Sequence, residues 1–156
     1  MNEHRPSDPD FESRIRASFS AQQVMQTIGA RLAHIGPAEV RIELPFSPAL
    51  TQQHGYLHAG VVGAIIDSAC GYAAYTLMPA GSEVLTVEYK VNFLSPAKGE
   101  TFVAIGKVVK PGRTLTVCSG EAWAHTGGRR KLVATLQSTL ISVPNEGGSG
   151  ASGPAF

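Results

Sequence analysis

The chain has 156 residues, of which 43% are hydrophobic and 16% are charged, and its formal net charge at pH 7 is +1. This composition excludes an intrinsically disordered protein, and the small net charge gives no electrostatic basis for nucleic-acid binding. The length suits one domain with a substantial core. We expect that domain to span residues 10–143, between disordered segments at residues 1–9 and 144–156.

The two cysteines, Cys70 and Cys118, lie far apart in apolar contexts and form no CxxC pair. This use of cysteine is typical of a reducing compartment, and the first residues contain no apolar segment of the kind that signal peptides carry. We therefore expect a cytoplasmic protein. The histidines lack metal-ligand spacing with carboxylates or cysteines, so we expect no metal and no other cofactor.

The first predicted element is an amphipathic helix over residues 11–28, where apolar residues recur at helical spacing. Asp8 or Asp10 is placed to cap its start, and Gly29 lies near its end. Two short strands are expected next, and residues 47–57 form a loop that is rich in Gln, His and Gly.

Residues 59–77 form a long run of apolar and small residues in which Asp67 is the only charge. We interpret this run as a buried core helix instead of a membrane span, because it is rich in Gly, Ala and Ser and is interrupted by the carboxylate. A single apolar helix needs cover on both sides, and a strongly curved sheet provides that cover. The sequence therefore predicts an α+β fold with one central helix.

The strands are predicted from the alternation of apolar and polar residues between turns. They cover residues 30–35, 40–45, 84–94, 100–110, 113–125 and 131–143. The strand at 84–94 alternates most regularly and contains neither proline nor glycine. As an exposed edge, such a strand would invite uncontrolled pairing with other chains.

An aspartate at position 67 is energetically unfavourable. An aspartate inside a helix costs about 0.5 kcal/mol in propensity against alanine, and burial of an unpaired carboxylate adds more. Such a residue usually has a partner or a chemical function. Its structural alternatives are to cap a loop or to pair with a histidine, and its functional one is to act as a base or nucleophile.

Three motifs then carry a family resemblance, in order and in the expected elements. They are Gln52-x5-His58-Ala59-Gly60-x6-Asp67, the segment from Thr86 to Ala97, and Gly112-Arg113-Thr114. On these residues the chain resembles the hotdog-fold acyl-CoA thioesterases of the phenylacetate-degradation (PaaI-like) type. The resemblance spans roughly residues 25–143 and implies a long helix wrapped by a curved antiparallel sheet.

The resemblance implies a catalytic role for five residues. Asp67 matches the helix-borne carboxylate that attacks the thioester or activates water, and Thr86 matches a residue that orients this water. Gln52 takes the place of an amide side chain in the same site. His58 and Ala59 match a His-Gly pair at the helix start, where a backbone N–H polarises the thioester carbonyl. The structural alternatives are a loop residue for Gln52, a packed histidine for His58 and an ordinary strand residue for Thr86.

The chain departs from the family pattern at two positions. Ala59 stands where the family usually has glycine, and Gln52 stands where asparagine is commoner. The backbone N–H survives the change to alanine if Ala59 takes helical dihedral angles, and the Gly60 amide is expected to help bind the carbonyl. The resemblance also implies a homodimer or homotetramer, because family sites lie across a dimer interface.

CoA carries phosphates, so cationic residues on the strands and turns are candidates to bind it. The candidates are Lys90, Lys110 and Arg113, with Thr114 beside them in the third motif. Solvated surface charges are the alternative for each lysine and arginine.

We therefore predict an acyl-CoA thioesterase that releases a free acid and CoA, with a preference for an aryl or medium-chain acyl group. Neither a nucleic acid nor a membrane is expected as a partner. One alternative is a hotdog hydratase or dehydratase, whose Asn-Pro or Gly-His-Phe-Pro segments are absent from the sequence. The other is a non-catalytic acyl-CoA-binding protein, against which Asp67 argues, whereas Ala59 keeps it open.

Overall fold

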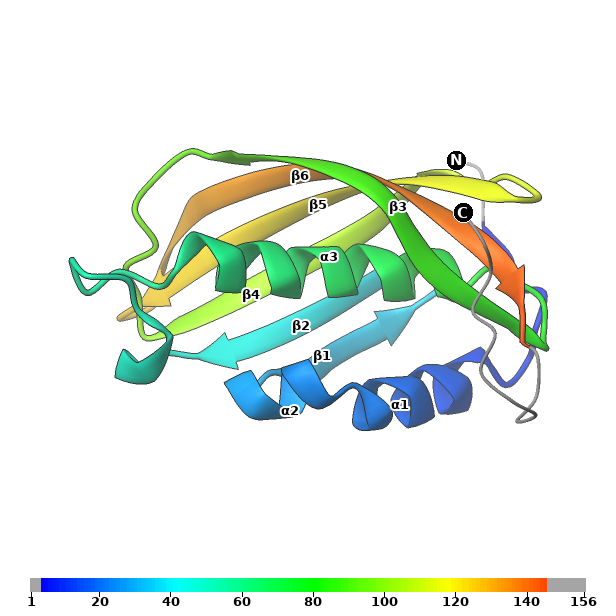
Figure 1. The fold of residues 1–156 in the computed structure, drawn as a ribbon, viewed down its shortest axis with the longest axis horizontal. Coiled ribbons are helices and arrows are strands. Elements are labelled where there is room, and N and C mark those ends of the chain that lie inside the picture. Colours follow the sequence, from blue (N-terminus) through cyan, green and yellow to red (C-terminus); the bar gives the residue numbers. More distant parts are fainter. Residues whose placement is uncertain (1–3, 146–156) are drawn as a thin grey trace.

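The computed structural model describes residues 4–145, and residues 1–3 and 146–156 lie outside the described part. Two helices come before the first strand, and a third, longer helix lies between the second and third strands (Figure 1). The helices are α1 (Phe11–Ala21), α2 (Gln23–Ile28) and α3 (Ala59–Tyr75), with a short 3-10 turn, η1 (Pro48–Leu50). The strands are β1 (Arg31–Gly36), β2 (Glu39–Pro45), β3 (Ser82–Phe93), β4 (Thr101–Lys110), β5 (Leu115–Thr126) and β6 (Arg129–Pro144).

These strands form one antiparallel sheet in the order β1-β2-β4-β5-β6-β3. The sheet curves around α3, which lies along its inner face (Figure 1). The α+β architecture predicted from the sequence, one central helix wrapped by a curved antiparallel sheet, is thereby confirmed.

Two glycines let α3 touch the backbone of the sheet. Gly106 and Gly120 are register partners on β4 and β5. A Cβ on Gly106 would lie 2.3 Å from the backbone of Ala69, and a Cβ on Gly120 would lie 2.3 Å from Ile66 Cγ2. Only glycine permits so close an approach, and the contact fixes α3 on the sheet at the level of Asp67.

The single helix predicted over residues 11–28 is wrong in one respect, because it is two helices that meet at Gln22. Gln22 has extended dihedral angles (φ −78°, ψ 97°), and its side-chain amide donates to Ser68 Oγ of α3 at 3.3 Å. This tertiary contact overrides a helical periodicity that continues through the break. Asp10 is the N-cap of α1 by position, although its side chain makes no capping bond, and Gly29 ends α2 at a φ of 78°.

Arg14 of α1 binds the C-terminal end of α3. Its guanidinium donates to the carbonyl oxygens of Tyr75 at 3.0 Å and Met78 at 2.9 Å. It also donates to the Pro79 carbonyl at 2.6 Å and pairs with Asp8 at 3.3 Å. A cation at this place satisfies carbonyl groups that have no partner within the helix and suits the negative end of the helix dipole.

The strand β3 lies at one edge of the sheet, and β6 is its only neighbour among the described strands. A bulge between Thr86 and Glu88 interrupts its register with β6. The side chains of Val87, Tyr89 and Phe93 are between 46% and 49% exposed. Val91 of the same strand packs against the core, so the apolar face of β3 is only partly covered by the chain itself.

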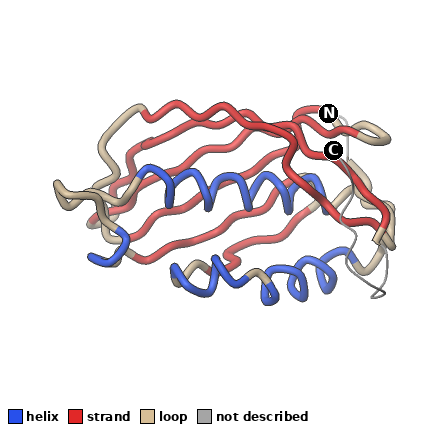
Figure 2. The backbone as a smooth tube through the Cα atoms, in the orientation of Figure 1, coloured by secondary structure: helices blue, strands red, loops and turns tan. Residues whose placement is uncertain are grey.

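The connections gather at the two ends of the sheet (Figure 2). At one end the Leu57 N–H donates to the Ala97 carbonyl at 3.0 Å, which joins the loop before α3 to the loop after β3. At the other end the Ser142 N–H donates to the Thr114 carbonyl at 2.9 Å, beside the turn between β4 and β5. This separation decides which candidate residues can share a site within one chain.

The predicted terminal segments lie only partly within the described residues. Asp8, in the segment 1–9, is 7% exposed, and Pro144, in the segment 144–156, is the last residue of β6. The remainder of both segments, residues 1–3 and 146–156, lies outside the described part. Of the helices within residues 4–145, none has the length and apolar character needed to cross a membrane.

Candidate functional site

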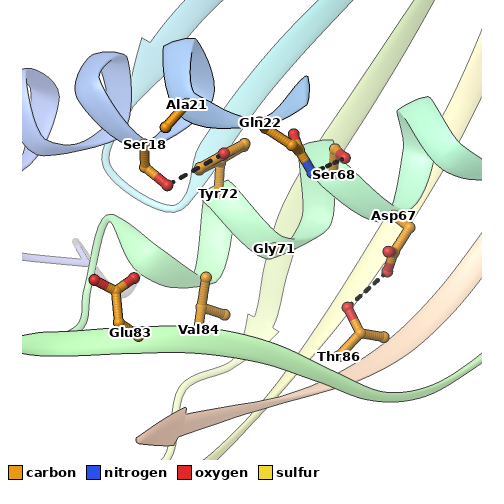
Figure 3. A pocket seen from close by; sticks show the side chains of 10 residues that line it. All are labelled: Ser18, Ala21, Gln22, Asp67, Ser68, Gly71, Tyr72, Glu83, Val84 and Thr86. Atoms are coloured by element: carbon orange, nitrogen blue, oxygen red, sulfur yellow. Dashed lines mark hydrogen bonds between the residues drawn. The ribbon is translucent and has the colours of Figure 1, made fainter. Parts of the chain in front are cut away.

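Asp67 lies midway along α3, and its side chain contacts the edge strand β3. Its Oδ1 accepts a hydrogen bond of 2.9 Å from the Thr86 hydroxyl (Figure 3). Thr86 comes directly before the bulge of β3. Both residues line a cavity of about 330 Å³. The structure therefore brings these two candidates together.

Burial raises the pKa of Asp67 above its ordinary value, and the hydrogen bond from Thr86 opposes part of this rise. A raised pKa makes the carboxylate a stronger base. Within residues 4–145 its recorded partner is Thr86 and not a histidine, so the structural alternative of an Asp–His pair does not hold there. The second oxygen, Oδ2, has no recorded hydrogen bond in the same residues and is available to a water molecule.

The C-terminal part of α1 and Gln22, which follows it, form one wall of this cavity, and the sequence alone did not predict this wall. Ser18 Oγ lies 3.3 Å from the hydroxyl of Tyr72 on α3, and Gln22 at the helix break also lines the cavity. Polar residues on an amphipathic N-terminal helix ordinarily face solvent. Only the tertiary arrangement places Ser18 and Gln22 in the wall of the cavity that Asp67 also lines, and no local signal in the sequence could have found them.

A second cavity, of about 280 Å³, lies at the N-terminal end of α3. Gln52 and Ala59 line it, together with apolar groups that include Phe93 at the end of β3. His58 is the N-cap of α3, and its Nδ1 accepts a 2.9 Å hydrogen bond from the Gly60 N–H. This bond leaves the ring proton of the neutral His58 on Nε2, and it occupies the Gly60 amide.

The Ala59 N–H is the free donor of this helix start. No acceptor is recorded for it among residues 4–145, as expected for the first amide of a helix, and it lies at the positive end of the helix dipole. Gln52 presents a second donor. Its Oε1 accepts from the backbone N–H groups of His54 and Tyr56, which leaves its NH₂ group unoccupied in the described chain.

The two cavities are separate within one chain. From Ala59 to Asp67 the helix rises by about 12 Å, at about 1.5 Å per residue, and none of the lining residues is shared between the two cavities. A carbonyl group within hydrogen-bond distance of the Ala59 N–H cannot also lie beside Asp67 of the same chain. The structure therefore brings Asp67 to Thr86 and Ala59 to Gln52, but it does not join the two pairs.

The four residues expected to hold CoA are exposed and line neither of these cavities. Lys90 lies on β3. Lys110 ends β4, and Arg113 and Thr114 lie in the turn before β5. That turn, between β4 and β5, is at the opposite end of the sheet from the start of α3 (Figure 1).

Neither cysteine belongs to a reactive site. Cys70 and Cys118 are free and buried, and burial raises the pKa of Cys70 to about 12. The thiolate needed for nucleophilic attack is therefore disfavoured. Over residues 4–145, no three His, Cys, Asp or Glu side chains are grouped so that they could hold a metal ion.

Comparisons with known proteins place the chain among thioesterases. A family model described as the thioesterase superfamily matches residues 54–131. A thioesterase family protein from Silicibacter pomeroyi is 50% identical, and its crystal structure has a TM-score of 0.85 over 86% of this chain and 98% of that chain. Human acyl-coenzyme A thioesterase 13 is 28% identical over 127 residues, which are 80% of this chain and 89% of that protein. The PaaI protein from the phenylacetic acid degradation operon of E. coli, at 16% identity, shares the fold with a TM-score of 0.78 over 86% of this chain and 94% of that chain.

Proposed function

The chain belongs to the thioesterase superfamily as a hotdog-fold thioester hydrolase of the PaaI-like type, and we propose that it is a cytoplasmic acyl-CoA thioesterase. It would convert an aryl or medium-chain acyl-CoA to the free acid and CoA. The observation that carries this proposal is the half-buried Asp67 carboxylate, which is held by Thr86 in the wall of a cavity of about 330 Å³.

Asp67 would act as a general base or as a nucleophile. As a base, its Oδ2 takes a proton from water while the water oxygen bonds to the thioester carbonyl carbon; the C–S bond then breaks, and the sulfur leaves with a proton as the CoA thiol. As a nucleophile, the carboxylate itself bonds to that carbon, CoA leaves, and water hydrolyses the mixed anhydride. In both courses Thr86 holds Oδ1, so that Oδ2 faces the reacting atoms.

The developing oxyanion needs donors, and we assign this role to the Ala59 N–H and the Gln52 NH₂ group. Both residues line the cavity at the start of α3, where the helix dipole also favours negative charge. His58 would be a positioning residue, because its ring holds the first turn through the Gly60 N–H. It is not required to transfer a proton.

The complete site would take Asp67 and Thr86 from one protomer and Ala59 and Gln52 from its partner, because one chain holds these pairs apart. The strand β3 supports this arrangement, since Thr86 near its start lines the first cavity and Phe93 at its end lines the second. Antiparallel pairing of β3 with its copy around a two-fold axis would set the start of one strand against the end of the other. Each homodimer would then hold two sites, and a homotetramer would be two such dimers.

The nucleotide end of CoA would lie outside the cavities, where its phosphates meet exposed cations. Lys90, Lys110 and Arg113 are the proposed phosphate ligands, and Thr114 adds a hydroxyl donor. Gly60 has no assigned contact with the substrate, because its N–H is held by His58 and a Cβ there would lie 3.1 Å from His58 Nδ1.

A panel of acyl-CoA esters tests the function. The purified protein is incubated with aryl, medium-chain and enoyl esters, and free thiol is measured with a thiol reagent. We expect thiol release, and Asp67→Asn is the matched control, expected to be slower by at least about a hundredfold. Tight binding without thiol release would indicate a non-catalytic acyl-CoA-binding protein. Loss of enoyl absorbance without thiol release would indicate a hydratase, and either result would overturn the proposal.

A further inference from the structure

Tyr89 lies on β3 between Thr86, which lines the Asp67 cavity, and Phe93, which lines the cavity at the start of α3. We propose that the Tyr89 hydroxyl donates a hydrogen bond to the sulfur of the thioester, so that Tyr89 is a further catalytic residue that stabilises the departing CoA thiolate. This role rests on the proposed function, in which Asp67 supplies the base or nucleophile and the leaving group has no donor of its own.

A bulge in β3 turns Tyr89 to the side of the sheet that Thr86 also faces. In a regular strand, residues three apart point to opposite sides, but the register of β3 with β6 shifts between Thr86 and Glu88. The partners of Thr86 and Tyr89 on β6 are therefore Leu140 and Ser138. Both partners are fully buried, so the side chains of Thr86 and Tyr89 both point toward α3.

The phenol of Tyr89 lies against α3 one turn before Asp67. A Cβ on Gly63 would lie 3.9 Å from the Tyr89 hydroxyl oxygen. Gly63 and Asp67 are four residues apart, so they share one face of the helix at a spacing of about 6 Å along its axis. Helix side chains lean toward the N-terminus, which carries the Asp67 carboxylate toward the turn that the hydroxyl covers. Tyr89 and Asp67 therefore flank one position from neighbouring elements.

The Tyr89 hydroxyl is available to a substrate. The hydroxyls of Tyr72 and Tyr75 pair with Ser18 and Glu83, whereas no partner is recorded for the Tyr89 hydroxyl within residues 4–145. The Tyr89 side chain is 46% exposed. A phenol offers one O–H donor, and here that donor is open to water in the free protein and to a ligand in the complex.

The direction of the cavity indicates which atom of the substrate meets this donor. From Asp67 the cavity extends toward the C-terminal end of α3, since Gly71 and Tyr72 line it (Figure 3). An acyl group in this cavity lies on the C-terminal side of the reacting carbonyl carbon. The sulfur is bonded to the other side of that carbon, so it points toward the turn at Gly63 and the Tyr89 hydroxyl. The hydroxyl is thus placed for the leaving group and not for the acyl chain.

The chemistry of the leaving group gives this hydrogen bond its effect. The C–S bond breaks with its electron pair on sulfur, and an alkyl thiol has a pKa of about 8.5, so the sulfur becomes an anion as it departs. A hydrogen bond to an anion is stronger than one to a neutral thioester, and it therefore favours the transition state. The thiolate then takes a proton from solvent, and Asp67 returns to solvent the proton that it took from water. Tyr89 keeps its own proton throughout.

Three hexanoyl thioesters that differ only in the thiol test this role. They are the esters of CoA, of N-acetylcysteamine, which reproduces the reactive end of CoA, and of 4-nitrothiophenol, whose acidic thiol leaves as an anion without help. For Tyr89→Phe we expect kcat for the first two esters to fall by at least about tenfold with little change in KM, because the lost bond forms mainly in the transition state. The nitrothiophenol ester should slow by about threefold or less.

Two other variants and one physical measurement serve as controls. Asp67→Asn should slow all three esters by at least about a hundredfold, since each of them needs the carboxylate. Tyr56→Phe removes a tyrosine hydroxyl from the wall of the other cavity and should leave the ratios among the three esters unchanged. Light scattering should find the wild-type mass for Tyr89→Phe, because this variant keeps the ring.

Equal slowing of all three esters by Tyr89→Phe would indicate a structural role and overturn the assignment. Unchanged rates would overturn it too. Slowing of the CoA ester alone would place Tyr89 against the nucleotide part of CoA instead of the sulfur. In each of these cases the thioesterase function stands. If the wild-type protein hydrolyses none of the three esters, the proposed function fails, and the assignment of Tyr89 to the leaving sulfur fails with it.

Discussion

The Thr86 hydroxyl donates to Asp67 Oδ1 at 2.9 Å and so ties the edge strand β3 to the central helix α3. This is the single recorded hydrogen bond to the Asp67 carboxylate among residues 4–145, and burial still raises its pKa despite that bond. The bond lies on a strand whose outer edge is unpaired in the described chain. The proposed acid–base chemistry of Asp67 and the proposed pairing of β3 with a second copy therefore involve the same part of the molecule.

Asp67→Asn keeps the shape of the side chain and an acceptor for Thr86, but it removes the base. We expect kcat to fall by at least about a hundredfold. In the wild type, kcat should rise with pH through a pKa above that of an ordinary aspartate, because the ionised form is the active one. Assays of thiol release, stopped at fixed times across a pH series, measure both effects. Near-normal turnover by the purified Asn variant would exclude Asp67 from the chemistry.

The raised pKa of Asp67 also predicts how stability depends on pH. Between the unfolded and folded pKa values the folded state binds more protons, so stability falls as pH rises through that window. Above the folded-state pKa, the ionised Asp67 carboxylate destabilises the folded state by its full amount. We therefore expect Asp67→Asn to have a higher Tm than the wild type at pH 7, and the difference to vanish at pH values below the unfolded pKa. An Asn variant that melts lower at pH 7 would contradict this account.

The position of Asp67 could be predicted because a lone charge in an apolar helical run stands out locally. The strands could be predicted because each alternates between clear turn residues, and their observed bounds differ from the expected ones by only a residue or two. The exposure of β3 could not be predicted from the sequence. The alternation of apolar and polar residues shows that the strand has two different faces, but it does not show whether other parts of the chain pack on the apolar face. Val87 and Tyr89 are about half exposed for this reason.

The break at Gln22 and the cavity wall at Ser18 could not be predicted, because both depend on where α1 packs against α3. Their side chains bond to Ser68 and Tyr72, which lie dozens of residues away in the sequence. The role of Gly60 was also hidden. Its amide is expected from position alone to be a free donor, whereas the His58 ring folds back onto it. This capping depends on the rotamer of the His58 side chain, which the sequence does not specify.

Arg14 is expected to contribute strongly to stability. Its guanidinium donates to carbonyl oxygens that close the end of α3, and it lies 4.1 Å from the centroid of the Tyr75 ring. Arg14→Ala should lower the free energy of unfolding by about 2–3 kcal/mol, because charged hydrogen bonds to half-buried carbonyls are lost. Arg14→Lys should recover part of this, since an ammonium cannot reproduce the planar fork. Urea unfolding of both variants checks the order, and an Ala variant as stable as the wild type would refute it.

Ala59 tests the oxyanion donor. Ala59→Pro deletes the unoccupied N–H and little else, because proline is tolerated at the first position of a helix. We expect kcat/KM to fall on the order of a hundredfold or more. Ala59→Gly keeps the N–H and is the matched control, expected to be nearly neutral. If the two variants turn over acyl-CoA alike, the carbonyl is polarised by another group.

Subunit complementation tests whether the site is shared between two chains. In the proposed dimer each site takes Asp67 from one protomer and Ala59 from the other. A heterodimer of Asp67→Asn with Ala59→Pro would therefore contain one intact site and one doubly damaged site. If the two inactive variants are unfolded together and refolded in equal amounts, half of the dimers are mixed. We then expect about a quarter of the wild-type activity to return, as random assortment around a two-fold axis requires.

The control is each variant refolded alone, which should stay inactive. If each chain held a complete site by itself, mixing the two variants would restore no activity. That result would contradict the proposal of a site shared between two chains. Tyr89→Lys on the exposed edge of β3 adds an independent measure. Repulsion between like charges facing each other across the two-fold axis should dissociate the dimer and abolish activity together. Light scattering that finds a fully active 16.4 kDa monomer would remove the basis for a shared site, because about 12 Å of helix separates the Ala59 amide from Asp67 within one chain.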